Sequence, residues 1–452
     1  MTTAHRSWTL HETARDNGRR LALAPLVTGS PANAGAPVIT LDANRTFQEI
    51  VGFGGALTES AAWALWQVSP AQRAKVLHAY FHPTEGLGYN LARTHINSCD
   101  FSVNSWVLDD TSGDHELKDF TLDPMRRWVM PLLHEARDIA GFDLRFLASP
   151  WSPPSWMKTN ASMLQGGKLR PDCRDTWARY YIRFLEAMRS EEGIDFWGLT
   201  VQNEPAATQP WESCIYTPEE ERDFIRDHLG PALAGSDHRD TKLICFDHNR
   251  DILEAYAGAV FADPAAARYV WGAALHWYVS EDFAASSRLL AKFPDKHVLF
   301  SEGCWEGGAK PGQWDRGERY ARNIIGDLNH GVCGWIDWNI ALDLKGGPNH
   351  VGNLCDAPVL VDATTKEVHF QSSFYYIGHF SKFIHPGARR ISCEPSAAGL
   401  QTTAFANPGG ALAVVVHNPG AEAIDFSLAC GAETLACHIP AAAIQTYTSA
   451  VV

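Results

Sequence analysis

The middle of the chain repeats one pattern: a short apolar run, a polar loop and a helical segment. Several of the runs are apolar at almost every position, which is typical of parallel strands covered on both faces. The eight runs lie at residues 49–54, 89–95, 144–149, 196–201, 242–246, 272–277, 297–301 and 331–338. Between them, Ser69-Pro70 and the Thr217/Glu220 capping box mark helix starts. Eight strand–helix repeats predict a (β/α)8 TIM barrel in an α/β protein.

The two ends of the chain carry a different pattern. Short apolar runs alternate with turns at residues 400–405, 411–417, 423–428, 434–438 and 443–448. Two further strand-like runs, residues 7–13 and 38–42, precede the first barrel strand. We therefore predict an antiparallel β-sandwich side domain built from both chain ends, residues 1–45 and 386–452, beside a catalytic barrel at residues 46–385.

Composition and charge narrow the class of protein. Of 452 residues, 45% are hydrophobic and 20% charged, which is typical of a globular chain. The net charge of −14 disfavours nucleic acid and anionic membrane partners. No run is long enough to span a membrane and no secretory signal is visible, so we expect a cytoplasmic location. The 16 tryptophans suit either a core or the faces of sugar rings.

Cofactor and disulfide motifs are missing from the sequence. The ten cysteines are scattered without a CxxC pair, which favours a reducing compartment. Cys430 and Cys437 could meet across two strands, but we favour free thiols. His11-Glu12 lacks the second histidine of a zinc helix, and there is neither a GxSxG elbow nor a phosphate loop. We expect no metal and no cofactor.

Two glutamates follow barrel strands directly, Glu204 in TVQNEP and Glu302 in FSEGCW. The carboxyl ends of barrel strands are where such enzymes place catalytic groups. A single glutamate is ordinarily a surface residue, but a pair at strand ends among aromatic and amide side chains favours cleavage of glycosidic bonds. Polar and aromatic residues close the neighbouring strands: Asp100, Trp151, Asn203, His276, Trp277, Tyr278, Asp337, Trp338 and Asn339.

Seven segments that contain these residues resemble glycoside hydrolase family 30, the family of acid β-glucosidase (glucosylceramidase). They are FQEIVGFGGALTESAA, RTHINSCDFS, LASPWSPPSWMKTN, GLTVQNEP, SEGCWEG, WIDWNIALDLKGGPNHVGNLCDAPVLVD and FYYIGHFSKFI. The segments keep the family's order from about residue 46 to 385, and the β-rich tail fits the family's side domain.

The resemblance implies a retaining mechanism with Glu204 as the general acid/base and Glu302 as the nucleophile. Carboxyl groups about 5–5.5 Å apart leave no room for a bridging water, so one of them attacks the sugar. We expect the charge on Glu302 to raise the pKa of Glu204 until the glycosyl-enzyme forms. Asn203 would donate to the sugar 2-hydroxyl.

Further site residues follow from the same resemblance. Asp100, Trp151, Trp338 and Asn353 would grip the hydroxyls of the non-reducing sugar. Arg93 would be a cation beside the nucleophile or, equally, part of a structural ion pair.

The strand end His276–Tyr278 would place Tyr278 at Glu302. Trp277 would line the pocket, with packing in the core as the alternative. Tyr216 and Trp211, in the loop after Glu204, would line the leaving-group side.

Two histidines depart from the family's pattern and bear on the substrate preference: His350 in GGPNH and His95 after the Arg93 strand. We expect a small-molecule or oligosaccharide β-D-glucoside rather than a ceramide-linked substrate, since no apolar lid is evident. The alternatives are an endo-β-1,6-glucanase, a β-xylosidase or β-fucosidase, and a carbohydrate-binding barrel without activity. The sequence indicates no oligomeric state.

Overall fold

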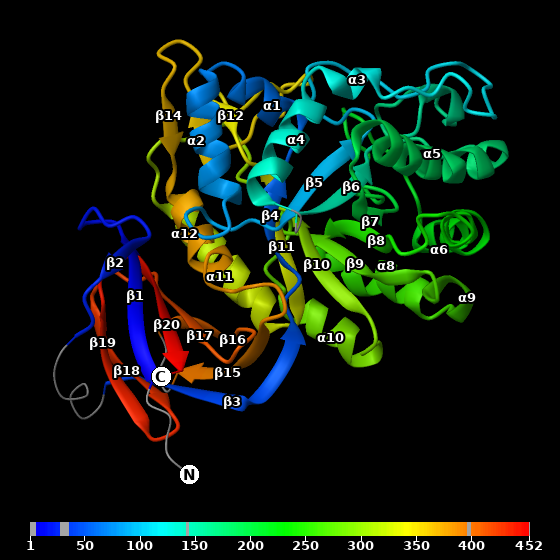
Figure 1. Ribbon diagram of the computed structural model, residues 1–452. Helices are drawn as coiled ribbons and strands as arrows, with labels where there is room; N and C mark the ends of the chain where they lie inside the picture. The colour runs from blue at the N-terminus through cyan, green and yellow to red at the C-terminus, as the bar shows by residue number, and fades with distance from the viewer. Residues whose placement is uncertain (1–5, 28–35, 142–143, 396–398, 452) are drawn as a thin grey trace.

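The computed structural model describes residues 6–27, 36–141, 144–395 and 399–451. Eight parallel strands close into a barrel in the order β10-β11-β4-β5-β6-β7-β8-β9, as predicted (Figure 1). Their bounds are β4 Gly52–Ala56, β5 Leu91–Ile96, β6 Arg145–Pro150, β7 Phe196–Thr200, β8 Lys242–Asn249, β9 Val270–His276, β10 His297–Glu302 and β11 Val332–Asn339. Each overlaps one of the eight apolar runs.

Helices cover the outside of the barrel. They are α1 Glu59–Leu65, α2 Pro70–Phe81, α3 Asp123–Arg126, α4 Val129–Ala140, α5 Arg174–Glu192, α6 Pro218–Phe224, α7 Gly230–Ala234, α8 Leu253–Phe261, α9 Pro264–Ala267, α10 Ala284–Lys292, α11 Asp315–Asn329 and α12 Ser372–Ser381. Both predicted starts are capped, since Ser69 accepts a hydrogen bond from the Gln72 amide and Thr217 from the Glu220 amide. Among the described residues, no helix combines the length and apolarity that a bilayer span needs.

The inside of the barrel is filled at one end. Six strands each contribute one apolar side chain to this plug: Leu91, Leu147, Ile244, Ala274, Leu299 and Ile336. Side chains that fill the interior make a barrel a packed core rather than a pore. The polar residues that end the same strands therefore gather above the plug, at the carboxyl edge.

The side domain is a nine-stranded sheet that contains both chain ends. Its order is β19-β18-β3-β15-β16-β17-β20-β1-β2. The strands are β1 Arg6–Ala14, β2 Ala22–Ala24, β3 Val38–Glu49, β15 Arg389–Pro395, β16 Gln401–Ala406, β17 Leu412–Asn418, β18 Ile424–Cys430, β19 Glu433–Ile439 and β20 Ala443–Val451. The first and last strands pair antiparallel, from Arg6 opposite Val451 to Ala14 opposite Ala443.

Strand β3 links the two domains and leads toward the barrel (Figure 1). It pairs antiparallel with β15 but parallel with β18, so the sheet is not antiparallel throughout. The boundary placed after residue 45 falls within β3, whose Thr46 and Glu49 still pair with β15. One feature that the sequence did not suggest is a small sheet after the barrel, β12 Leu342–Asp343, β13 Val359–Val361 and β14 Val368–Phe370.

All ten cysteines are free, as favoured from the sequence. Strand register explains why the candidate disulfide does not form. Cys430 lies opposite Glu433, whereas Cys437 lies opposite Phe426 near the other end of the β18–β19 pair. The two thiols therefore do not face each other.

Candidate active site

A pocket opens at the carboxyl edge of the barrel strands. It brings together both glutamates and most of the residues expected at a sugar site. The predicted residues that line it are Glu204, Glu302, Asp100, Trp151, Tyr278, Trp338, Asn353 and Trp211. Phe101, Gln209, His248, Asn249, Cys304, Glu306 and Cys355 line it as well.

Glu302 is the last residue of β10 and is held by two donors. Its Oε2 accepts a hydrogen bond from Arg93 Nη1 at 2.6 Å, and its Oε1 accepts one from Tyr278 Oη at 2.9 Å. Burial raises the pKa of Glu302, while the charges of His276 and Arg93 oppose that shift. The two donors fix the orientation of the carboxylate toward the pocket.

Arg93, in β5, is fully buried and connects four side chains. Besides Glu302 it donates to Asp247 Oδ2 at 2.8 Å, to Asn203 Oδ1 at 2.9 Å and to Ser149 Oγ at 3.0 Å. Both readings of Arg93 therefore describe it, since the cation beside Glu302 also belongs to a buried ion pair. Because Asn203 accepts through its oxygen, its amide NH2 group remains to donate.

Glu204 follows β7 in a strained backbone conformation, with φ of 48°. Its amide donates to the carbonyl of Asp247 at 2.9 Å, which ties the loop to β8. His276 Nδ1 lies 3.2 Å from Oε1, and Gln209 donates to Oε2 at 3.3 Å. The side chain of Glu204 is thus oriented by groups on two other strands or loops.

The pKa shift of Glu204 has the opposite direction to the one we expected. Burial alone would raise its pKa, but the hydrogen bond from His276 and the charges of His248 and His276 outweigh burial and lower it. The pKa of His276 rises to about 9; burial opposes this, and the charge of Glu302 and bonds to Asp247 and Glu204 bring it about. The contacts around the two side chains therefore favour an ionised Glu204 beside a protonated His276, the reverse of our expectation for Glu204.

Asp247, which the sequence analysis missed, is the buried centre of this network. It binds Arg93, His276 Nε2 at 3.0 Å, Ser301 Oγ and Thr200 Oγ1. Burial would raise its pKa, but Arg93 and His276 lower it far below the ordinary value. Its signal in the sequence is its position: Asp247 stands in FDHN at the end of the fifth barrel strand, as the other site residues stand at the ends of theirs.

The four residues expected to bind the hydroxyls of the sugar line the same pocket. Asp100 Oδ2 accepts hydrogen bonds from Asn353 and Asn349, both at 3.1 Å. The rings of Trp151 and Trp338 stack with centroids 5.3 Å apart. Burial raises the pKa of Asp100 to about 7.

Two expected pocket residues lie elsewhere. Trp277 is only 1% exposed and packs in the barrel core against Phe300, Tyr320 and Trp335, so the core alternative holds. The indole side chain points outward because the neighbouring His276 points inward, as successive strand residues alternate.

Tyr216 is buried and lines a separate cavity with Lys168, Arg174 and Phe224. It packs on Phe224 of the following helix α6, which turns its ring away from the pocket. Trp211, earlier in the same loop, does line the pocket.

His350 and His95, the two histidines that differ from the family's pattern, do not line the pocket but contact residues near it. His350 Nε2 lies 2.9 Å from Glu212 Oε2, and its amide donates to the Asp100 carbonyl at 3.2 Å. His95 is buried and accepts from the Glu59 amide at 3.1 Å.

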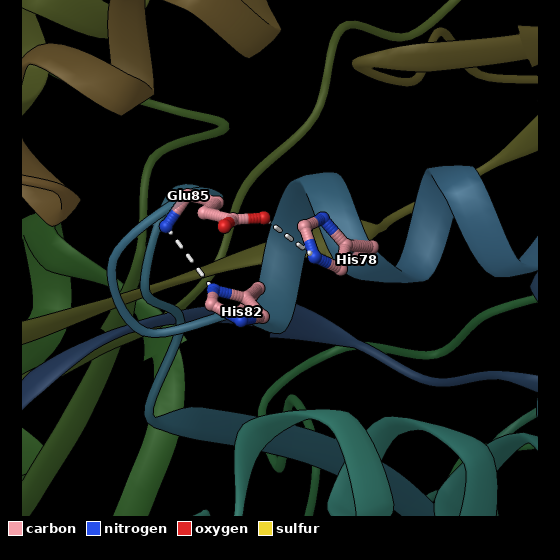
Figure 2. Close-up of side chains that lie close together, drawn as sticks. All are labelled: His78, His82 and Glu85. Atoms are coloured by element: carbon pink, nitrogen blue, oxygen red, sulfur yellow. Dashed lines mark hydrogen bonds and ion pairs between the residues drawn. The ribbon is translucent and has the colours of Figure 1, made fainter.

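Two groups of described side chains have the spacing of metal ligands. The first, His78, His82 and Glu85, lies at the end of α2 (Figure 2). There His82 Nδ1 accepts from the amides of Glu85 at 3.1 Å and Thr84 at 3.4 Å, so it caps the turn that follows the helix. The second group is Glu204, His248 and His276 in the pocket.

Comparison with known proteins agrees with this geometry. The family model described as "Glycosyl hydrolase family 30 TIM-barrel domain" matches residues 50–384, and "Glycosyl hydrolase family 30 beta sandwich domain" matches residues 387–447. The lysosomal acid glucosylceramidase of Mus musculus is 38% identical over 431 residues, 91% of this chain and 83% of the relative.

Two solved structures share the whole fold. SrfJ from Salmonella typhimurium is 33% identical with a TM-score of 0.93, over 98% of this chain and 99% of that chain. An endo-β1,6-glucanase is 28% identical with a TM-score of 0.89, over the same shares. The chain belongs to glycosyl hydrolase family 30 and is a glycosidase.

Proposed function

We propose that this glycosidase hydrolyses β-D-glucosidic bonds with retention, with Glu302 as nucleophile and Glu204 as general acid/base. The observation that carries the proposal is the unequal support of two carboxyl groups in one pocket. Glu302 is held by a guanidinium and a phenol, whereas Glu204 shares a hydrogen bond with a titratable imidazole. The first arrangement suits an ionised nucleophile, and the second suits a group that exchanges a proton.

The proton for the first step comes from His276. His276 Nδ1 lies 3.2 Å from Glu204 Oε1, so a proton carried by His276 passes along one hydrogen bond and converts Glu204 into the acid. Glu204 then protonates the leaving oxygen while Glu302 attacks the anomeric carbon. Asp247 on the opposite ring nitrogen keeps His276 oriented throughout.

In the second step Glu302 is uncharged, because its carboxylate has become an ester of the sugar. The pKa of Glu204 no longer feels that charge, so Glu204 takes a proton from water and the hydroxide attacks the anomeric carbon. The released sugar retains its β configuration because two displacements have occurred.

The support for a glucoside comes from the relatives and from the wall of the pocket. The mouse relative is a glucosylceramidase, and the pocket wall offers the carboxylate of Asp100 and the amide of Asn353 as partners for sugar hydroxyls. Endo-β-1,6-glucanase activity is the second candidate, since the solved structure of an endo-β1,6-glucanase aligns with this chain at a TM-score of 0.89. Both reactions cleave a bond to a β-linked glucose.

The deciding experiment is a panel of aryl β-glycosides of glucose, xylose, fucose and galactose beside a long β-1,6-glucan. We expect the glucoside to be turned over fastest and the glucan to yield glucose before oligosaccharides. Early release of mixed oligosaccharides would favour the endo-acting candidate instead. If another aryl glycoside were turned over faster, the proposed specificity for glucose would be wrong and that other sugar would be the preferred one.

A nucleophile variant tests the roles of the two glutamates. In Glu302→Ala we expect turnover to collapse and added azide to restore it partly, because azide fills the space and attacks in place of the carboxylate. The product would then be the α-glycosyl azide, since only one displacement occurs. Activity retained without azide would contradict the assignment.

A further inference from the structure

We propose that Glu204, His248 and His276 form a site for a borderline divalent cation, Zn²⁺ or Cu²⁺, whose binding inhibits the enzyme. The inhibition rests on the proposed function, because it withdraws Glu204 from its role as acid/base. The cation binding itself rests only on the geometry of the three side chains. Two imidazoles and one carboxylate are a common ligand set for Zn²⁺.

The spacing of the ligand atoms fits a tetrahedral ion. Glu204 Oε1 lies 3.2 Å from His276 Nδ1 and 3.7 Å from His248 Nδ1, and one ligand atom of each residue lies within 4.8 Å of the others. Ligands about 2.0–2.1 Å from a tetrahedral Zn²⁺ are roughly 3.3–3.4 Å apart. The separations of 3.2 Å and 3.7 Å from Glu204 Oε1 differ from that spacing by a few tenths of an ångström.

The second ring nitrogen of His276 is already engaged as it is in metal sites. Its Nε2 lies 3.0 Å from Asp247 Oδ1, and Asp247 is held in turn by Arg93. Histidines that bind metals commonly donate their other N–H to a carboxylate in this way. The cation would replace the proton shared by His276 Nδ1 and Glu204 Oε1, and that proton would leave to solvent.

His248 supplies an unused ligand. It is 7% exposed, and its Nδ1 makes no hydrogen bond to any residue that the structure describes. Buried polar atoms ordinarily have a partner. His248 is also one of the residues that line the pocket, and its Nδ1 lies 3.7 Å from Glu204 Oε1.

The backbone holds these groups in position. Phe246 and Asp247 have φ of 75° and 61°, and the pairing of β8 with β9 shifts register between Phe246 and His248. A bulge of this kind re-aims successive side chains. Asp247 therefore binds Arg93 inside the barrel while His248 reaches the pocket beside Glu204.

The surface group at the end of α2 provides an internal comparison (Figure 2). The side chains of His78 and Glu85 there are 43% and 71% exposed, and His82 Nδ1 is occupied by backbone amides. None of the three lines the pocket. We expect its removal to leave the basal activity unchanged, so that surface binding of Zn²⁺ can be separated from binding in the pocket.

The test uses the full chain after treatment with a chelator. We expect calorimetry to show Zn²⁺ binding and turnover of an aryl β-glucoside to fall with it, with recovery on adding EDTA. Cu²⁺ should act at lower concentration than Zn²⁺, and Mg²⁺ should not act, since hard cations prefer oxygen ligands.

Variants decide which residues bind the cation. Loss of even an outer partner weakens metal sites about 10–100-fold, so His248→Ala should weaken Zn²⁺ binding by at least ~10-fold. His248→Gln is the second variant, and thermal unfolding of both checks the fold. The double variant His78→Ala/His82→Ala should bind Zn²⁺ in the pocket and be inhibited as the parent is.

Three outcomes would overturn the proposal: no binding of Zn²⁺ to the parent chain, equal affinity in both His248 variants, or loss of binding in the α2 double variant alone. Calorimetry needs no turnover. A chain that binds Zn²⁺ through His248 but does not cleave β-glucosides would therefore contradict the proposed function and leave the cation site standing.

Discussion

At the scale of single residues, Asp247 holds the two side chains that contact the proposed catalytic glutamates. One carboxylate accepts from Arg93 and lies beside His276, and those two side chains contact Glu302 and Glu204 respectively. The proposed nucleophile and acid/base are therefore linked through a group that touches neither substrate nor reacting atom. Asp247 is a positioning residue.

Replacing this carboxylate by an amide tests the link. In Asp247→Asn we expect kcat/KM to fall on the order of 10²-fold or more, as when a histidine loses its orienting carboxylate. Without the negative charge the pKa of His276 falls from about 9, so the alkaline limb of the pH profile moves to lower pH. Stopped assays of kcat/KM across pH check both effects.

A matched buried pair away from the pocket is the control. Asp327 is fully buried and pairs with Arg250 at 2.8 Å. Asp327→Asn should lower the free energy of unfolding by about 3–5 kcal/mol, as breaking a buried ion pair does, without moving the pH profile. An unshifted profile in Asp247→Asn would contradict its role.

Strand ends predicted most of the pocket because position along a barrel strand fixes which edge a residue reaches. That reasoning located Glu204, Glu302 and Asp100. It could not decide between Trp277 and His276, since a one-residue uncertainty in strand register exchanges the inner and outer faces. The lowered pKa of Glu204 could not be predicted from the sequence, because it depends on contacts with His276 and His248 of two other strands.

At the scale of elements, the barrel is closed by close backbone contact. Gly54 in β4 lies opposite Leu91 in β5, and a Cβ at Gly54 would lie 1.8 Å from the Leu91 carbonyl oxygen. Since that oxygen belongs to the backbone of the next strand, no side-chain rotation relieves the overlap. Gly54 of the GFGGA segment thus serves the packing of neighbouring strands.

A pair of glycine substitutions tests this. Gly54→Ala should prevent soluble folding or lower the free energy of unfolding severely. Gly258→Ala, in the middle of α8 with no atom near its Cβ position, should raise it by about 0.5–1 kcal/mol through helix propensity. Urea unfolding and soluble yield measure both. Equal effects of the two substitutions would argue against the close-contact explanation.

The strands were predictable to within a few residues because apolar runs and turn residues mark them locally. The parallel pairing of β3 with β18 was not, since it joins residues far apart in the chain. The short sheet β12–β14 was missed for a related reason: two- and three-residue strands carry too little pattern.

At the scale of the whole molecule, one histidine joins the barrel to the side domain. His379 in α12 is buried, with Nδ1 2.8 Å from Thr446 Oγ1 and Nε2 2.9 Å from Thr13 Oγ1. The two threonines belong to β20 and β1, the strands at the opposite ends of the chain. The joint thus depends on a neutral imidazole that bonds through both nitrogens.

This joint should make stability depend on pH. Burial and the nearby His11 and His417 hold the pKa of His379 well below its ordinary 6.5. Below pH 6.5 the unfolded chain therefore binds a proton at this residue that the folded chain does not, and stability falls as the pH falls. The contribution is about 1.4 kcal/mol per pH unit between the two pKa values.

Comparing variants isolates this effect from the other buried groups. The stability advantage of the parent over His379→Gln should be largest at pH 7.5 and shrink by roughly 1.4 kcal/mol for each unit below pH 6.5, measured by urea unfolding. His385→Gln, at an exposed position just after α12, should show no such trend. A difference between parent and His379→Gln that stays constant down to pH 5 would mean that the joint accepts a charged imidazole, and that acid lability arises elsewhere in the molecule.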